Sequence, residues 1–265
     1  MAKHPAFDAD RWLEALPTRR SRRAYDGRPL LADDLDALEA TAAQFRPYED
    51  ARVVLVRDVP RTFFTGIIGS YGKVTGAPSA LVFIADGSSP LSAEHCGYTG
   101  EGLVLEANAL GLTTCWIAGS FSRSAVAAAM SLAPGEVVRA ISPIGHAVAE
   151  PTRAEVLLYG AKKPKRRLCL DEIAPGHEQW PAWAEAGLNA ARIAPSAMNR
   201  QPWRFRMEDG AVVVATSGPS LPLALARLDC GIAMLHFELG ARGEGCDGAW
   251  EPLTGGDVAR WVPLG

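Results

Sequence analysis

A succession of helix-forming and strand-forming segments that occurs twice constrains the fold of this chain more than any other feature. In the first half, an amphipathic helix predicted at 31–45 precedes two apolar runs of strand length, "ARVVLVRD" and "SALVFIAD". A helix over 95–112 that stops at Gly111, a buried strand at 113–119, a helix at 123–132 and a strand ending within 140–148 follow. In the second half the order resumes with a helix at 180–194, strands at 203–207 and 211–216, a long helix at 222–243 and a strand near 248–253.

The two halves can also be aligned residue by residue at fixed offsets. "VVLVRD" at 53–58 overlays "RFRMED" at 204–209 with an offset of 151, and an offset of 134 aligns Gly97 with Gly231 and Trp116 with Trp250. A second half that lacks most of the glycine-rich loop at 59–78 and its strand would explain why the two offsets differ, and a duplicated and then shortened unit would show such a loss. The alternative is that two unrelated stretches of mixed helix and strand slide into partial register by chance.

The composition of the 265 residues is that of a globular protein, with 48% hydrophobic and 22% charged residues and a formal net charge of −3. No run approaches the roughly 18 consecutive apolar residues of a membrane helix, and the first residues lack an apolar secretory core. We therefore expect a cytoplasmic protein. The five cysteines are scattered without a C-x-x-C pair, and no two histidines have i, i+4 spacing, so the pattern predicts free thiols and no metal site.

Two basic segments are candidates for binding a phosphate. "TRRSRRAY" places four arginines around Ser21, and guanidinium groups beside a hydroxyl form strong charge-assisted hydrogen bonds to phosphate. The alternative for this segment is a solvated basic turn. The second segment, "KKPKRR" at 162–167, is poor evidence for a nucleic-acid partner in a chain that is net acidic. The two segments could instead converge on one phosphate.

A third segment, "GLTTCWIAGSFS" at 111–122, ends a predicted buried strand in small residues. Gly119 removes the steric barrier to a close approach of the backbone to a flat ligand. The alternative is an ordinary turn with Ser122 as the N-cap of the next helix. "GIIGSYGKV" does not fit the P-loop pattern, and neither a G-x-S-x-G motif nor a catalytic triad is evident.

The nine residues "PSAMNRQPW" at 195–203, taken with "RRSRRAY", "GLTTCWIAGSF" and "KRRLCLDEI", resemble the FMN-binding nitroreductase family. The order of these elements is similar to that of the internally duplicated single-chain branch, the putative TM nitroreductases, and the likeness spans roughly Pro17 to Trp250. One departure is that the first half reads "TAAQFRPYEDA" where a second such element would stand. We therefore expect one flavin site per chain.

In that family two identical subunits form an intertwined dimer with FMN between them, and each subunit contributes different motifs. The resemblance therefore implies an α+β fold with a mostly antiparallel central sheet flanked by helices, arranged as a tandem pseudo-dimer in one chain. Residues 1–160 would form the first half and residues 161–265 a second, reduced half, the two intertwined around one flavin site.

The same resemblance implies the residues that bind FMN, which are Arg19, Arg20, Ser21, Arg23, Ala118, Gly119, Lys165, Arg167, Pro195, Ser196, Asn199 and Gln201. The arginines and Ser21 would hold the phosphate and ribityl chain or the pyrimidine edge, with Lys165 and Arg167 closing on the phosphate. The 195–201 element would lie along the isoalloxazine from the other half, and the 118–119 backbone would contact the ring. Ala118 stands where the family often has glycine. The tryptophans at 116, 203 and 250 are predicted to be core residues rather than stacking platforms.

The implied function is transfer of electrons from NADH or NADPH through FMN to a nitroaromatic, quinone or similar planar acceptor. Because the cofactor carries the redox chemistry, no catalytic side chain is predicted. The expected partners are small molecules, with neither nucleic acid nor membrane, and a monomer is possible because one chain mimics the dimer. Two alternatives remain open, namely a flavin-binding or flavin-carrier protein without redox turnover, and a family member with other chemistry such as dehydrogenation or flavin fragmentation.

Overall fold

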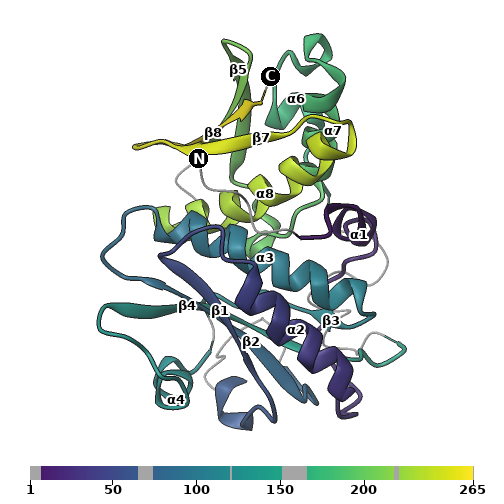
Figure 1. Ribbon diagram of the computed structural model, residues 1–265, viewed down its shortest axis with the longest axis vertical. Helices are drawn as coiled ribbons and strands as arrows, with labels where there is room; N and C mark the ends of the chain where they lie inside the picture. Colours follow the sequence, from purple (N-terminus) through teal and green to yellow (C-terminus); the bar gives the residue numbers. More distant parts are fainter. Residues whose placement is uncertain (1–6, 65–73, 120, 151–165, 218–220, 265) are drawn as a thin grey trace.

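The computed structural model describes residues 7–64, 74–119, 121–150, 166–217 and 221–264 (Figure 1). The strands of these residues form two sheets of four, and every pairing within each sheet is antiparallel. The first has the order β1 (Ala51–Val56), β2 (Ser79–Asp86), β4 (Glu136–Gly145), β3 (Thr113–Thr114). The second has the order β5 (Trp203–Glu208), β6 (Ala211–Thr216), β8 (Asp257–Pro263), β7 (Gly248–Pro252). The antiparallel α+β expectation is confirmed, but the single central sheet was wrong.

The two sheets share one connectivity. Each begins with a hairpin, continues through a long helix, and returns to place its last strand beside the second strand of the hairpin. Each also has a register shift in its second strand, between Phe83 and Ile84 in β2 and between Val214 and Ala215 in β6. The expected loss of a strand from the second half was wrong, because β6 is the counterpart of β2; strand β8, which pairs with β6 and is the counterpart of β4, was not predicted. Arg260 and Pro263 interrupt the apolar pattern of β8, which explains why the sequence did not predict it.

The helices that the structure describes are α1 (Ala9–Ala15), α2 (Ala32–Gln44), α3 (Ser92–Ala109), α4 (Arg123–Ala128), α6 (Leu170–Ile173), α7 (Ala182–Arg192) and α8 (Leu223–Gly243), with 3-10 turns η1 (Arg61–Phe64), η2 (His177–Gln179) and η3 (Ala197–Asn199). Five of these helices, α2, α3, α4, α7 and α8, match predicted segments, although α4 is shorter than predicted, and α1 and α6 were not predicted. Among the residues described, no helix is both long and apolar enough to span a bilayer.

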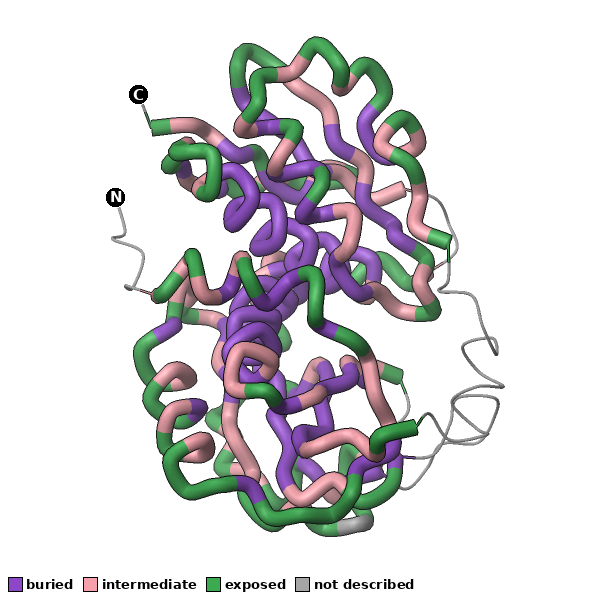
Figure 2. The backbone as a smooth tube through the Cα atoms, turned by 90° about the vertical axis from the view of Figure 1, so that its right-hand side faces the viewer, coloured by how far each residue is buried: buried purple, intermediate pink, exposed green. Residues whose placement is uncertain are grey.

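Helices α3 and α8 lie between the two sheets and are buried along nearly their whole length (Figures 1 and 2). Most of their residues are small or apolar, and buried charged side chains such as Glu94 and Arg227 pair with each other, so both helices can occupy the centre of the molecule. A single hydrophobic cluster runs from Trp12 in α1 through both helices to Trp261 in β8. A smaller cluster fills the opposite face of the first sheet, around Phe63, Val126 and Ile141. The two sheets are therefore joined through a continuous core.

The crossing of α3 and α8 depends on two glycines. A Cβ atom on Gly97 would lie 2.0 Å from the carbonyl oxygen of Leu228, and one on Gly231 would lie 2.0 Å from that of Glu94. Both distances are far shorter than any real Cβ contact, so the backbones meet where neither residue has a side chain. These are the two glycines that the offset of 134 aligned, and each faces the residue three positions before the other.

Candidate anion and cofactor site

The arginine-serine segment follows α1 and runs along the edge of the first sheet. Ser21 forms a parallel bridge with Thr114 of β3, and the backbone N–H of Arg22 donates to the Thr114 carbonyl at 3.0 Å. The Arg19 side chain points inward and is only 5% exposed, and its Nη1 lies 3.4 Å from Ser21 Oγ. The guanidinium of Arg23 donates through Nε to Cys115 Sγ at 3.4 Å. The first sheet therefore holds this segment against the strand that leads to Ala118 and Gly119.

Four arginines from three segments lie within electrostatic range of Arg167 or of one another, and we call Arg19, Arg20, Arg167 and Arg192 the arginine cluster. Arg167 donates to the carbonyl oxygens of Ala194 at 2.6 Å and Ile193 at 3.0 Å. Burial, followed by the positive charges of Arg19, Arg20 and Arg192, lowers the pKa of Arg167 to about 10. Arg167 of the second basic segment thus lies near Arg19 and Arg20 of the first.

Two of the donors of the arginine cluster lack acceptors. Arg19 Nε and Arg192 Nε are buried and have no hydrogen-bond partner among the residues that the structure describes. Within the described residues, the one carboxylate that forms an ion pair with the cluster is Glu101, whose Oε1 lies 4.0 Å from Arg19 Nε. A buried donor without an acceptor costs about 1–3 kcal/mol, so the cluster suits an anion that brings several oxygens. A phosphate group fits this donor set.

The 195–201 element adopts a backbone that few residues tolerate. Met198, Asn199 and Gln201 have φ angles of 52°, 58° and 50°, in the left-handed region. Such conformations cost energy, and they persist where surrounding contacts hold them, often at binding sites. Their concentration within four residues explains why this short stretch has so specific a sequence.

Side chains of this element bind the second basic segment. Gln201 is 3% exposed, and its Oε1 accepts from the Leu168 N–H at 2.9 Å while its Nε2 donates to the Arg166 carbonyl at 3.2 Å. Asn199 Nδ2 donates to the same carbonyl at 3.0 Å, and Ser196 Oγ accepts from the Gln201 N–H at 2.9 Å. The element therefore positions the chain on both sides of Arg167. Lys165 lies outside the described residues.

Replacing Gln201 with alanine is expected to lower the free energy of unfolding by about 1 kcal/mol, because the half-buried Leu168 N–H loses its acceptor and the Arg166 carbonyl loses one of its two side-chain donors. Thermal unfolding followed by circular dichroism measures the loss. Asn189→Ala is the matched control, since that amide lies on the surface of α7 and donates to the Glu185 carbonyl of its own helix. Equal melting temperatures for the two variants would contradict this role for Gln201.

Ala118 and Gly119 follow β3 at the other end of the arginine-serine segment. The Ala118 carbonyl accepts from Arg123 Nη2 at 3.2 Å, and a Cβ on Gly119 would meet nothing within 4 Å. The backbone at Gly119 is thus open to a neighbour. Among the described residues, however, no hydrogen bond connects 118–119 with the 195–201 element.

The tryptophans behave as predicted: Trp203 and Trp250 are buried, and Trp116 packs on Phe83 with ring centroids 4.1 Å apart.

Sequence reasoning missed a buried polar pair beneath the arginine cluster. Glu101 of α3 accepts from Trp116 Nε1 at 2.6 Å and lies 2.9 Å from His236 Nε2 of α8, and both residues of the pair are 0% exposed. His236 Nδ1 faces the Ala190 carbonyl at 3.2 Å, an acceptor, so Nδ1 carries a proton. The signal in the sequence was a charged or polar residue within a helix whose other residues are mostly small or apolar, because such a residue needs a buried partner.

Asp229 of α8 was also missed. Its carboxyl is buried, and both oxygens face the Ala197 N–H of the left-handed element, at 3.2 and 3.0 Å. Burial raises the pKa of the Asp229 carboxyl to about 8, and the hydrogen bond from Ala197 offsets only part of this shift. A mostly protonated acid therefore supports the turn at neutral pH.

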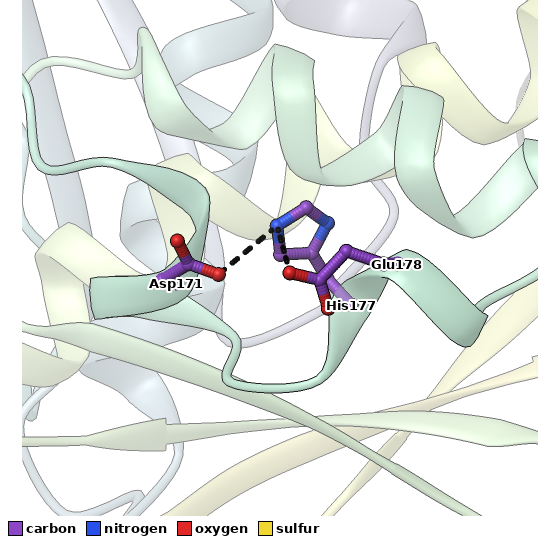
Figure 3. A group of neighbouring side chains, drawn as sticks. All are labelled: Asp171, His177 and Glu178. Carbon is purple, nitrogen blue, oxygen red and sulfur yellow. Dashed lines mark ion pairs between the residues drawn. The ribbon is translucent and has the colours of Figure 1, made fainter.

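A third group of side chains lies away from these elements, where Asp171, His177 and Glu178 converge (Figure 3). His177 Nε2 is 3.5 Å from Asp171 Oδ1 and 3.8 Å from Glu178 Oε1, and both carboxylates are exposed. Metal-bound histidines almost always donate through their other ring nitrogen. In the part of the chain that the structure describes, His177 Nδ1 is instead buried without a hydrogen-bond partner, so this group lacks the support of a metal site.

The fold and the site define an α+β protein whose two antiparallel sheets meet at a buried helix crossing, with an arginine cluster at their junction. Residues 12–241 match the family model described as "Putative TM nitroreductase". The chain therefore belongs to this family. Among curated proteins, none matches the sequence.

Solved structures share the fold. A putative nitroreductase from Thermotoga maritima is 21% identical, with a TM-score of 0.59, and the match covers 99% of this chain and 96% of that one. A nitroreductase with bound FMN from Bacteroides fragilis is 20% identical with a TM-score of 0.44, over 60% of this chain and 94% of that one. An FMN-dependent nitroreductase from Clostridium difficile is 21% identical with a TM-score of 0.44, over 52% and 88%. The first likeness shows the common fold, and the other two are too distant to support more.

Proposed function

We propose that this protein is an FMN-dependent oxidoreductase of nitroreductase type, in which one chain forms the flavin site that two subunits form elsewhere in the family. The observation that carries the proposal is the arginine cluster, in which the charges of Arg19, Arg20 and Arg192 act on Arg167 and two buried Nε donors lack acceptors among the described residues. An FMN phosphate is a dianion with several oxygens, and it would satisfy both the charge and the donors. Family membership supports the same cofactor.

The remaining residues then have distinct roles. Arg19, Arg20 and Arg167, with Lys165, would hold the phosphate, and Ser21 and Arg23 the ribityl chain or pyrimidine edge. Pro195, Ser196 and Asn199 would lie along the ring, with the 118–119 backbone at its edge. Gln201 would act indirectly, because its side chain holds the chain around Arg167. When bound, FMN supplies transfer of electrons from NADH or NADPH to a nitroaromatic, quinone or similar planar acceptor.

The proposed internal duplication divides the chain into 1–160 and 161–265. Three observations support it: the shared strand order of the two sheets, the reciprocal glycines of the helix crossing, and a pair of equivalent helix residues. His95 and Asp229 are related by the offset of 134, and each contacts the turn before the first strand of its own half. His95 Nδ1 lies 2.7 Å from Asp50 Oδ1, as Asp229 Oδ2 lies 3.0 Å from the Ala197 N–H. With both halves in one chain, a monomer suffices.

The turns differ in a way that fits one flavin per chain. In the first half, the Tyr48 ring stacks on His95 with centroids 3.8 Å apart and an interplanar angle of 4°. In the second half, the equivalent turn has the left-handed residues and faces the buried Asp229 carboxyl. We therefore expect a stoichiometry of one FMN per chain.

The double variant Arg19→Ala with Arg167→Ala is expected to weaken FMN binding about 100-fold, because it removes two charge-assisted contacts to the phosphate. Quenching of flavin fluorescence in a titration of the apoprotein gives the dissociation constant. The control is Arg57→Ala with Arg260→Ala, two arginines that pair with surface carboxylates. If the two double variants bound FMN equally, the phosphate assignment would be wrong.

Anaerobic addition of NADH or NADPH to the flavin-loaded protein separates an oxidoreductase from a carrier. Bleaching of the flavin absorption band by either reductant supports redox turnover. An unchanged spectrum with both, in protein that retains FMN, would favour the flavin-carrier alternative.

A further inference from the structure

The chain that continues from β3 pairs with β4 only as far as Ile117. Ile117 and Ile141 exchange two backbone hydrogen bonds, both of 2.9 Å. In an antiparallel ladder the next such pair would lie two residues further along each strand, at Gly119 and Arg139. Arg139 is also the residue that β4 leaves out of its pairing with β2. Among the described residues no hydrogen bond joins Gly119 to Arg139, so the Gly119 N–H that would continue the sheet lacks a partner there.

Arg123, the first residue of α4, bridges the two chains at the point where this ladder ends. Its Nη1 donates to the Val138 carbonyl of β4 at 2.7 Å, and its Nη2 donates to the Ala118 carbonyl at 3.2 Å. The guanidinium carbon lies 4.8 Å from the centroid of the Phe121 ring, which supports it from one side. The planar fork of a guanidinium can hold two carbonyls at once, whereas an ammonium group has no such fixed pair of donors.

The hydrogen bond to the Ala118 carbonyl determines where the next N–H points. The C=O of Ala118 and the N–H of Gly119 belong to one planar trans peptide, in which the two groups point in opposite directions. Because the carbonyl is held toward Arg123, the N–H is turned away from it. Gly119 is exposed, and a Cβ there would meet nothing within 4 Å. Arg123 therefore keeps a backbone donor directed at open space.

We propose that Arg123 is a positioning residue for the flavin ring, because it directs the Gly119 N–H to the ring edge and so raises the reduction potential of bound FMN. This role rests on the proposed function, which puts the 118–119 backbone at that edge. A hydrogen-bond donor beside a flavin favours the electron-rich reduced form, and such contacts are a means by which a protein tunes its cofactor. Arg123 acts through the peptide and needs no contact of its own with the ring.

The test is the two-electron midpoint potential of the full-length protein saturated with FMN, measured anaerobically against a reference dye. Arg123→Ala is expected to lower the ratio of reduced to oxidised flavin at a fixed potential about tenfold, a shift of about 30 mV for a two-electron couple. Arg123→Lys keeps the charge without the fork and is expected to show most of this loss. Arg57→Ala is the matched control, because it removes the same charge just after β1, at the opposite edge of the sheet from β3, and should keep the wild-type potential.

Gly119→Pro tests whether Arg123 acts through the Gly119 N–H, since proline has no such donor. Gly119→Ala controls for the added atoms, and melting temperatures show that each variant is folded. Adding Arg123→Lys to Gly119→Pro is expected to cause no further shift.

Three results would overturn the role of Arg123 while leaving the flavin function intact. They are a wild-type potential in Arg123→Ala, full recovery of the potential by Arg123→Lys, and additive shifts in the double variant with Gly119→Pro. A wild type that binds no FMN would instead contradict the proposed function itself, and the role of Arg123 with it.

Discussion

Gly231→Ala is expected to prevent the chain from reaching its native fold, and Gly97→Ala is expected to do the same. The added methyl group would lie 2.0 Å from a backbone carbonyl oxygen of the partner helix in each case. No rotamer change relieves a clash with backbone, so α3 and α8 would have to separate. Ordinary overpacking costs about 1–3 kcal/mol, and separating two central helices costs more, which approaches the whole stability of a typical domain.

The contacts at the helix crossing also explain why the loss of native structure would extend beyond the two substituted glycines. Arg227 of α8 forms a buried ion pair with Glu94 of α3, with Nη2 and Oε1 2.5 Å apart, and it donates further to three carbonyls around the turn between β7 and β8. Separating the helices would leave these charges buried without partners, which is strongly unfavourable. Soluble yield and circular dichroism measure the outcome. Gly256→Ala serves as the control, because a Cβ there meets nothing within 4 Å and its φ is ordinary.

Native spectra and a melting temperature within a few degrees of wild type for Gly231→Ala would show that the helices do not approach as closely as described. The reciprocal variant provides an internal check. Because Gly97 and Gly231 occupy equivalent positions of one contact, their substitutions should have similar effects. A large effect at one glycine and none at the other would argue against the symmetry of the crossing.

Asp229→Asn is expected to stabilise the protein at alkaline pH and to leave it unchanged at acidic pH. Burial raises the pKa of this carboxyl to about 8, whereas an unfolded aspartate titrates near 4. Between these values the folded protein binds more protons than the unfolded chain, so stability falls as pH rises from about 4 to about 8. The penalty is complete above pH 8 and has an upper bound of about 5 kcal/mol. An asparagine keeps an oxygen for the Ala197 N–H but carries no charge.

Urea unfolding at pH 5, 7 and 9 measures this effect. The gain of Asp229→Asn over wild type should widen steadily with pH. Asp257→Asn is a control of opposite sign, because a hydrogen bond from Arg206 lowers the pKa of that carboxyl and its charge is favourable above its ordinary pKa. A pH-independent difference for the Asp229 variant would show that its carboxylate has a compensating partner in the folded protein.

Local pattern predicted most of the elements. The hairpin strands β1 and β2 were evident from β-branched apolar runs, and α8 from a long stretch with apolar residues on every side. Local pattern was insufficient where an element depends on its neighbours. Strand β8 is held by pairing with β6 and β7 on its two sides, despite Arg260 and Pro263. Whether the strands formed one sheet or two also depended on how the halves pack, which periodicity does not encode.

The candidate site also combines features that are evident in the sequence with features that only the structure shows. The arginine-serine segment and the 195–203 element were recognisable because each is a short run of unusual residues. The sequence did not reveal that Gln201 holds the chain around Arg167, nor that Asp229 faces the Ala197 N–H. A buried acid on an apolar helix gives no indication of its partner, because the partner comes from another part of the chain.

By itself, the sequence determined most of the helices and strands and the two basic segments, because each arises from interactions among residues close together in the chain. Only the tertiary structure decided that Arg19 and Arg167 lie in one cluster and that Gly97 and Gly231 meet at the helix crossing. Both depend on the packing of α3 against α8. That packing depends on a close approach of two backbones and on buried charged pairs, both between residues that are far apart in sequence. A local sequence pattern therefore does not predict it.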